Sequence, residues 1–99
     1  MTGLAPVPLP VQYNDLSSQE RRLVRERYVR KQSGLCSGCD EPLDGPPHIS
    51  VANAHIDWSL FPKNFQDHPV HLHHDHTTGL TIGAVHARCN AFLWQYFGE

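Results

Sequence analysis

Three cysteines and one histidine occur in two pairs with the same spacing. Two residues separate Cys36 from Cys39, and two residues separate His86 from Cys89. Zinc prefers four tetrahedral sulfur and nitrogen donors, and ligands spaced in this way can bind one ion from a single turn. Because the protein fills all four positions, we predict a structural zinc site. A redox-active Cys-x-x-Cys is the alternative, although the second pair and the lack of a thioredoxin-like pattern argue against it.

A second group of candidate residues lies in the segment His71-Leu-His73-His74-Asp75-His76. A histidine changes its charge near neutral pH, so one of these side chains could serve as a general base. Asn90 directly follows the last cysteine of the expected zinc site. We expect a hairpin and a following helix to bring it near His73 and His74. A histidine tract that only covers the surface or sequesters metal is the alternative.

The elements that must position these residues begin after a proline-rich segment. Residues 1–14 contain three prolines and no charged side chain, so we expect an extended or disordered arm there. The remaining residues, 15–99, are enough for a single domain. Ser17 and Glu20 have the spacing of a capping box, which predicts a helix over residues 18–31.

This predicted helix carries most of the positive charge. Six of the eight Lys and Arg residues fall within it, although the net charge of the chain is -2. The local field rather than the net charge attracts a polyanion, so the helix is a candidate nucleic-acid-binding surface. An ordinary solvated charged face is the alternative. The candidate residues are Arg21, Arg22, Arg25, Arg30 and Lys31.

The rest of the chain predicts a turn-rich knuckle over residues 34–47 and a long loop over residues 48–69. A strand over residues 70–74, a turn and a strand over residues 80–85 predict a hairpin, which is followed by an apolar helix over residues 90–97. We interpret the large aromatic residues of the loop and this helix as core rather than as platforms for nucleic-acid bases. These residues are Trp58, Phe61, Phe65, Trp94, Tyr96 and Phe97.

The stretch LHHDHTTGLTIGAVHARCNAFLW resembles the core of the HNH endonucleases, and most of all the recombination endonuclease VII branch found in phages. That branch reads approximately Asp-His-Asp-His, Thr-Gly, a short strand and Cys-x-x-Cys-Asn, with another Cys-x-x-Cys upstream. The resemblance covers residues 36–94. It implies a small α+β zinc-stabilised domain with a ββα-metal (His-Me finger) core and an N-terminal basic helix.

The resemblance also implies an activity. The chain would be a metal-dependent endonuclease that hydrolyses phosphodiester bonds in DNA with low sequence specificity. His74 would be the general base, and His76 would contact the scissile phosphate or complete the site. Asn90 would hold the helix or, together with His73, coordinate a catalytic Mg²⁺, Mn²⁺ or Ni²⁺ ion.

Three positions depart from the family pattern. His73 replaces an Asp, Ile82 replaces an Arg and His86 replaces a Cys. The change at His86 is harmless because both residue types bind zinc. An imidazole at position 73 suits manganese or nickel better than magnesium. The change at Ile82 removes a contact that would serve the phosphate or the fold.

The sequence also sets expectations about partners and location. We find neither a secretion signal nor an apolar run that approaches the roughly 20 residues needed to cross a membrane. We therefore expect a cytoplasmic protein, in the host cell if it is phage-encoded. Its expected partners are DNA and other phage DNA-processing proteins, and we expect a monomer or a weak dimer. A zinc-stabilised DNA-binding module without catalysis, or a regulatory protein that binds a host partner, are the alternatives.

Overall fold

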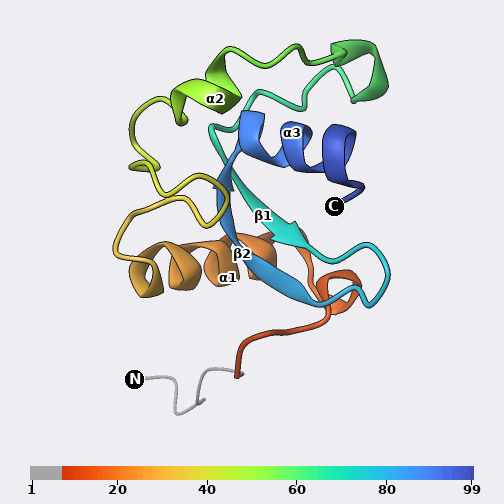
Figure 1. Ribbon diagram of the computed structural model, residues 1–99. Coiled ribbons are helices and arrows are strands. Elements are labelled where there is room, and N and C mark those ends of the chain that lie inside the picture. The colour runs from red at the N-terminus through yellow and green to blue at the C-terminus, as the bar shows by residue number, and fades with distance from the viewer. Residues whose placement is uncertain (1–7) are drawn as a thin grey trace.

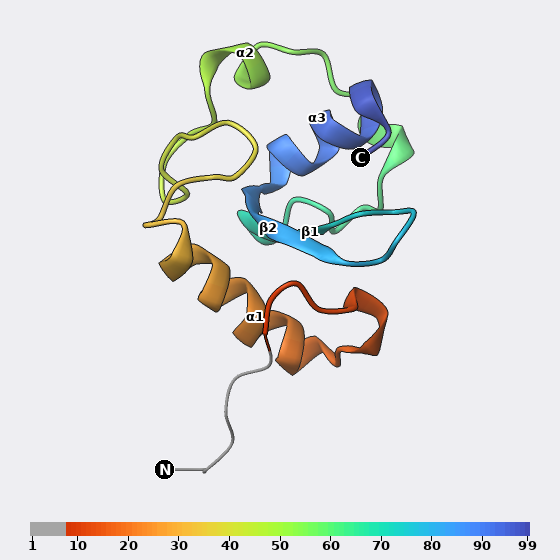
Figure 2. The same cartoon turned by 60° about the horizontal axis from the view of Figure 1, so that its bottom comes forward.

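A computed structural model describes residues 8–99, in which an antiparallel hairpin lies between two helices (Figure 1). The strands are β1 (Val70–His74) and β2 (Thr81–His86). Helix α1 (Ser18–Lys31) covers one face of the hairpin, and α3 (Ala87–Phe97) covers the other (Figure 2). The chain is therefore a small α+β fold. No helix of the described residues is long and apolar enough to cross a membrane.

The predicted helix over residues 18–31 is confirmed, and its N-terminal cap is the predicted one. The backbone N–H of Glu20 donates to the Ser17 hydroxyl, and the Ser17 N–H donates to the Glu20 carboxylate. Gln32 follows the last turn. Its side-chain amide bonds both the N–H and the carbonyl of Ala84 at 2.9 Å, which joins the end of α1 to the middle of β2.

Residues 8–14 of the predicted arm lie against the start of β2, whereas residues 1–7 of that arm lie outside the described part of the chain. The N–H of Thr81 donates to the carbonyl of Val11 at 2.9 Å, and the Val11 N–H donates to the Thr81 hydroxyl at 3.0 Å. The Tyr28 hydroxyl lies 2.8 Å from the same Thr81 oxygen. Thr81 thus connects the N-terminal segment, α1 and β2.

The predicted hairpin is confirmed, with Leu72 opposite Ala84 and a bulge between His73 and His74. The connecting turn is built around Asp75. Its carboxylate accepts the backbone N–H groups of the two following threonines, and its backbone N–H donates to the carbonyl of residue 80. The bulge ends the regular alternation of side chains at the two adjacent histidines.

The predicted loop over residues 48–69 contains two short helices that the sequence did not predict, α2 (Ile49–Ala52) and η2 (Trp58–Leu60). Side chains of α3 form hydrogen bonds with the backbone of this loop. The Arg88 guanidinium donates to two carbonyls of residues 51–54, and the Tyr96 hydroxyl and the Gln95 amide donate to the carbonyl of His55. Helix α3 begins at Ala87, three residues before the predicted start.

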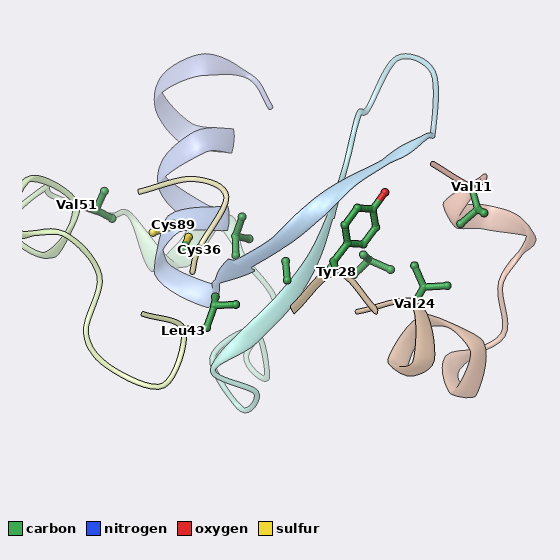
Figure 3. Packing of buried hydrophobic residues seen from close by; sticks show 10 residues of the cluster. Val11, Val24, Tyr28, Cys36, Leu43, Val51 and Cys89 are labelled. Atoms are coloured by element: carbon green, nitrogen blue, oxygen red, sulfur yellow. The ribbon is translucent and has the colours of Figure 1, made fainter. Parts of the chain in front are cut away.

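The buried core is mainly aliphatic (Figure 3). It contains Val24 and Tyr28 of α1, Val11 of the N-terminal segment and Leu72 of β1, while Cys36 and Cys89 lie together at the start of α3. Among the described residues, none of the six aromatic residues predicted as core belongs to this cluster. The prediction is wrong for Trp94, Tyr96 and Phe97, which are exposed on the outer part of α3. Trp58, Phe61 and Phe65 of the loop are half-buried and form a separate cluster of rings outside the core.

Candidate functional site

The first candidate site is a cluster of three thiols and an imidazole where the knuckle meets the start of α3. The ligand atoms of Cys36, Cys39, His86 and Cys89 all lie within 4.8 Å of one another. Nδ1 of His86 is 3.5 Å from the sulfur of Cys39 and 3.5 Å from that of Cys89. Tetrahedral zinc with ordinary bond lengths separates sulfur and nitrogen ligands by about 3.6 Å. This group could therefore hold a structural metal such as zinc.

The surroundings of the cluster favour metal-binding forms of its side chains. Nε2 of His86 donates to the carbonyl oxygen of Pro42 at 2.8 Å, which keeps the ring proton on Nε2 and leaves the Nδ1 lone pair facing the sulfurs. The backbone N–H groups of Gly38 and His48 donate to two of the cysteine sulfurs. Hydrogen bonds of this kind stabilise thiolates, which are the forms that bind zinc.

Of the two buried cysteines in the cluster, Cys36 loses its thiol proton more readily than Cys89. A hydrogen bond from the thiol of Cys89 lowers the pKa of Cys36 to about 4, and backbone N–H donors strengthen the effect. The same contact raises the pKa of Cys89. Cys36 is therefore the thiolate of this pair, and a bound divalent cation would favour loss of the remaining thiol protons.

The second candidate site is a cavity of about 540 Å³ between β1, α3 and the loop that precedes β1. His74 at the end of β1, His76 in the turn and Asn90 in the first turn of α3 all line it. Three of the four predicted catalytic residues therefore share one cavity. Among the described residues that line it are one arginine and four histidines but no acidic side chain, which suits an anionic ligand.

The ring of His74 belongs to a stack of side chains. The Tyr13 ring lies parallel to it with 3.9 Å between ring centroids, and the His76 ring stacks on it at 4.9 Å. The guanidinium of Arg21 lies 3.9 Å from the centroid of the Tyr13 ring. Burial lowers the pKa of His74 below its ordinary value, and nearby His76, His73 and Arg21 lower it further. The imidazole is therefore neutral at neutral pH and able to accept a proton.

His71 belongs to the candidate histidine segment, but the sequence prediction gave it no role in the site. Its Nδ1 lies 3.1 Å from the side-chain nitrogen of Asn90, and its ring meets Phe65 edge-on with 4.6 Å between centroids. Burial lowers the pKa of His71, so the neutral ring can accept a hydrogen bond from the Asn90 amide. The signal in the sequence was its position two residues before His73, which places both on one face of a strand.

His73 takes a different place from the other predicted catalytic residues. Its side chain is only 3% exposed, and Nε2 lies 2.7 Å from the carbonyl oxygen of Glu99. Among the described residues, His73 is not one of those that line the cavity. The prediction that His73 and Asn90 hold one metal ion stays a prediction.

The predicted nucleic-acid-binding residues of α1 fall into two groups. Arg21 belongs to the ring stack, and the partly buried Arg25 lines the cavity. Arg22, Arg30 and Lys31 are exposed to solvent and are not among the described residues of the cavity lining. Arg25 is therefore the cation of this helix that is placed to meet an anion inside the cavity.

No protein-family model, curated protein or solved structure matches this chain.

Proposed function

We propose that this chain is a metal-dependent endonuclease of the HNH type that hydrolyses phosphodiester bonds in DNA. The observation that carries the proposal is that His74, His76 and Asn90 line one cavity although they come from three different elements. A base, a phosphate contact and an oxygen ligand for a metal ion form a sufficient set for the attack of water on a phosphodiester. The expected phage origin rests on the resemblance alone.

The roles proposed for the side chains follow from their surroundings. The neutral His74 ring accepts a proton from the attacking water, and its stack with Tyr13 limits the directions that its nitrogens can take. His76 and Arg25 contact the non-bridging phosphate oxygens from the same cavity. These donors stabilise the negative charge that grows on the oxygens as water attacks.

A divalent metal ion of the first transition row would complete the proposed site. Such an ion, when bound, stabilises negative charge on the phosphate and leaving oxygens. Asn90 and His73 would hold it, and His73 would have to exchange its contact with the carbonyl of Glu99. Since imidazole nitrogen joins amide oxygen in this set, Mn²⁺ or Ni²⁺ suits the residues better than Mg²⁺.

The Cys₃His group would have a separate, structural task in this proposal. All four of its donors come from the protein, so a zinc ion there has no open position for water or substrate. It would join the knuckle to the first turn of α3 and thereby fix Asn90, which follows Cys89 directly.

Cleavage of supercoiled plasmid tests the proposal. The purified protein is incubated with EDTA, Mg²⁺, Mn²⁺ or Ni²⁺, beside His74→Ala and the control His55→Ala, which changes an exposed histidine outside the described cavity lining. We expect nicking that requires a divalent ion, survives in His55→Ala and falls by at least about 100-fold in His74→Ala. Retained zinc in both variants shows that the fold is intact.

Absence of cleavage with every ion, in protein that retains zinc, would refute the nuclease. Retained DNA binding in that case would support the zinc-stabilised DNA-binding module instead. The exposed Ile82 is the observation that favours this second function, since the resembled family has an arginine there.

A further inference from the structure

The cavity lining combines two kinds of side chain. Arg25, Asn90 and four histidines are polar or charged, whereas Leu60, Phe61, Phe65 and Trp94 are apolar. We call these four apolar residues the aromatic wall. Three of these residues come from the long loop, and Trp94 comes from α3. A ligand that fills the cavity therefore meets the cation Arg25, hydrogen-bonding imidazoles and apolar side chains at once.

The aromatic wall is exposed although it is rich in apolar surface. Trp94 is 40% exposed and Leu60 is 51% exposed. The Phe61 ring meets Trp94 edge-on at 5.6 Å and packs against Phe65 at 4.7 Å between centroids. Rings that pack against one another and still line a cavity are more typical of a binding surface than of a hydrophobic core.

The loop that carries most of this wall is fixed before any ligand binds. Gln95 of α3 bonds the N–H of Asp57 at 2.9 Å and the carbonyl of His55 at 3.1 Å, and Tyr96 bonds the same carbonyl at 2.7 Å. The Phe65 ring also contacts the His71 ring edge-on. The aromatic wall is thus preorganised beside the histidines, which reduces the entropy cost of ligand binding.

The polar and apolar side chains of the lining together indicate which class of ligand the cavity would bind. A nucleotide joins a flat apolar base to a phosphate, and aromatic side chains bind bases by stacking. In a duplex the base faces are stacked inside, so a base can lie on a protein ring only when it is unpaired. A cavity of about 540 Å³ has the size of a small-ligand pocket and is far smaller than a duplex.

We propose that the aromatic wall stacks an unpaired base next to the phosphate held by the histidines and Arg25, so that the preferred substrate is single-stranded or locally unpaired DNA. This inference rests on the proposed function for the role of the phosphate side. Stacking on a ring face tolerates every base, so the wall favours unpaired strands without reading their sequence.

Tryptophan fluorescence tests the proposal directly. The chain has two tryptophans, and Trp58→Phe leaves Trp94 as the single reporter. This protein is titrated, without an added divalent ion, with a short oligothymidylate, an oligouridylate and a DNA duplex of the same length. We expect the single-stranded DNA to quench Trp94 at a concentration roughly 10-fold lower than the duplex. The oligouridylate shows whether the site also accepts RNA.

Matched variants separate stacking from general loss of structure. Trp94→Leu removes the ring and should weaken single-strand binding roughly 10-fold in fluorescence anisotropy with a labelled oligonucleotide, whereas Trp94→Phe should restore most of it. Phe97→Leu is the control, because Phe97 is 63% exposed on the same helix and outside the described cavity lining. All variants should retain zinc.

Two results would overturn the inference. One is duplex binding as tight as single-strand binding, and the other is unchanged single-strand binding in Trp94→Leu. Neither result depends on cleavage, so a chain without nuclease activity that still binds single strands through Trp94 would refute the proposed function and leave the base site standing.

Discussion

The residue that the proposed chemistry depends on most, His74, is oriented by a neighbour from outside the hairpin. Tyr13 lies near the start of the described chain, and its ring is only 10° from parallel with the imidazole. Arg21 fixes Tyr13 in turn, because its guanidinium covers the ring and donates to the Tyr13 carbonyl at 3.2 Å. In the proposed chemistry, Tyr13 would therefore be a positioning residue for His74.

We expect Tyr13→Leu to free the His74 ring, while Tyr13→Phe preserves the stack because the hydroxyl has no part in it. The measurement is the NMR shift of the His74 ring protons, which a parallel ring at 3.9 Å moves upfield. Tyr13→Leu should remove most of that shift, since only the more distant His76 ring then stacks on His74, and plasmid cleavage should fall about 10-fold in kcat with little change in KM. A His74 spectrum that is the same in wild type and Tyr13→Leu would contradict the stack.

At the scale of elements, α3 organises the molecule more than its length suggests. Its first turn carries Cys89 and Asn90, and side chains of both its first and its later turns hold the long loop through hydrogen bonds to backbone carbonyls. Arg88 makes two of these bonds, at 3.0 Å to the carbonyl of Val51 and 2.6 Å to that of Ala54. Hydrogen bonds from a charged donor are among the stronger ones.

We therefore expect Arg88→Ala to lower the free energy of unfolding by about 2 kcal/mol, since two carbonyls lose a charged partner. Urea denaturation measures the total effect, and hydrogen exchange should show faster opening of residues 49–60 than of α1. Arg30→Ala removes an exposed arginine of α1 and serves as the control, with an expected change below about 0.5 kcal/mol. Equal losses in the two variants would argue against α3 as the support of the loop.

The elements differ in how far their sequence predicts them. Helix α1 was predictable because Ser17 and Glu20 form a local cap, and the hairpin because its turn is built from local contacts of Asp75. The pairing of Val11 with Thr81 was not predictable, since it joins residues 70 positions apart. The short helices of the loop escaped prediction because contacts with α3, rather than periodic apolar residues, hold the loop in place.

The same distinction applies to the candidate sites. The Cys₃His group was predictable from two equal spacings, because a single turn brings together two ligands that have two residues between them. Asn90 was predicted near the histidine tract from its place beside Cys89. The roles of Tyr13 and His71 depend on contacts between distant elements, so they required the structure. The different surroundings of His73 and His74 arise at the bulge between them, which the sequence does not signal.

At the scale of the whole molecule, the Cys₃His group could take the place of a larger core by holding a metal ion. Cys36 and Cys89 are each 1% exposed and belong to the buried cluster together with Leu43 and Val51. A chain of 99 residues with so few large buried side chains gains little from burial alone. A metal at this point would join segments some fifty positions apart, as the N–H of His86 already does with the sulfur of Cys36.

We expect one zinc ion per chain in the purified protein and loss of cooperative folding when it is removed. Structural zinc binds with about 10 kcal/mol or more, which exceeds the stability of most small domains. Circular dichroism and NMR during chelation should show unfolding, and Cys89→Ser should fail to retain the ion. His55→Ala is the control and should keep it. A chelated protein that keeps its dispersed NMR spectrum would exclude a structural role for the metal.

Acid should destabilise the whole molecule from just below neutral pH, because the fold buries a neutral histidine. Burial lowers the pKa of His71 below the value of 6.5 expected in the unfolded chain. Hydrogen bonds to the backbone of Phe65 and His68 raise this pKa, whereas the charges of His68 and Arg25 lower it, and the net shift is downward. As pH falls through 6.5, the unfolded chain takes up a proton at this position while the folded chain does not. The free energy of unfolding therefore falls until the pH reaches the lowered pKa of the folded state. Each unit by which that pKa is lowered corresponds to about 1.4 kcal/mol.

Urea denaturation at about pH 7.5 and about pH 6 measures this effect, with the zinc content determined at both pH values so that acid release of the metal is recognised. His71→Asn removes the titrating ring and keeps a polar side chain beside Asn90. We expect the variant to be less stable than wild type at the higher pH, because it loses packing against Phe65. It should lose less further stability on acidification, so the difference between the two proteins narrows. His74 contributes in the same direction, since burial also lowers its pKa, and its contribution persists in the variant.

A difference in the free energy of unfolding that stays constant between the two pH values would mean that His71 is equally protonated in the folded and unfolded chains. Burial would then not be what keeps the His71 ring neutral.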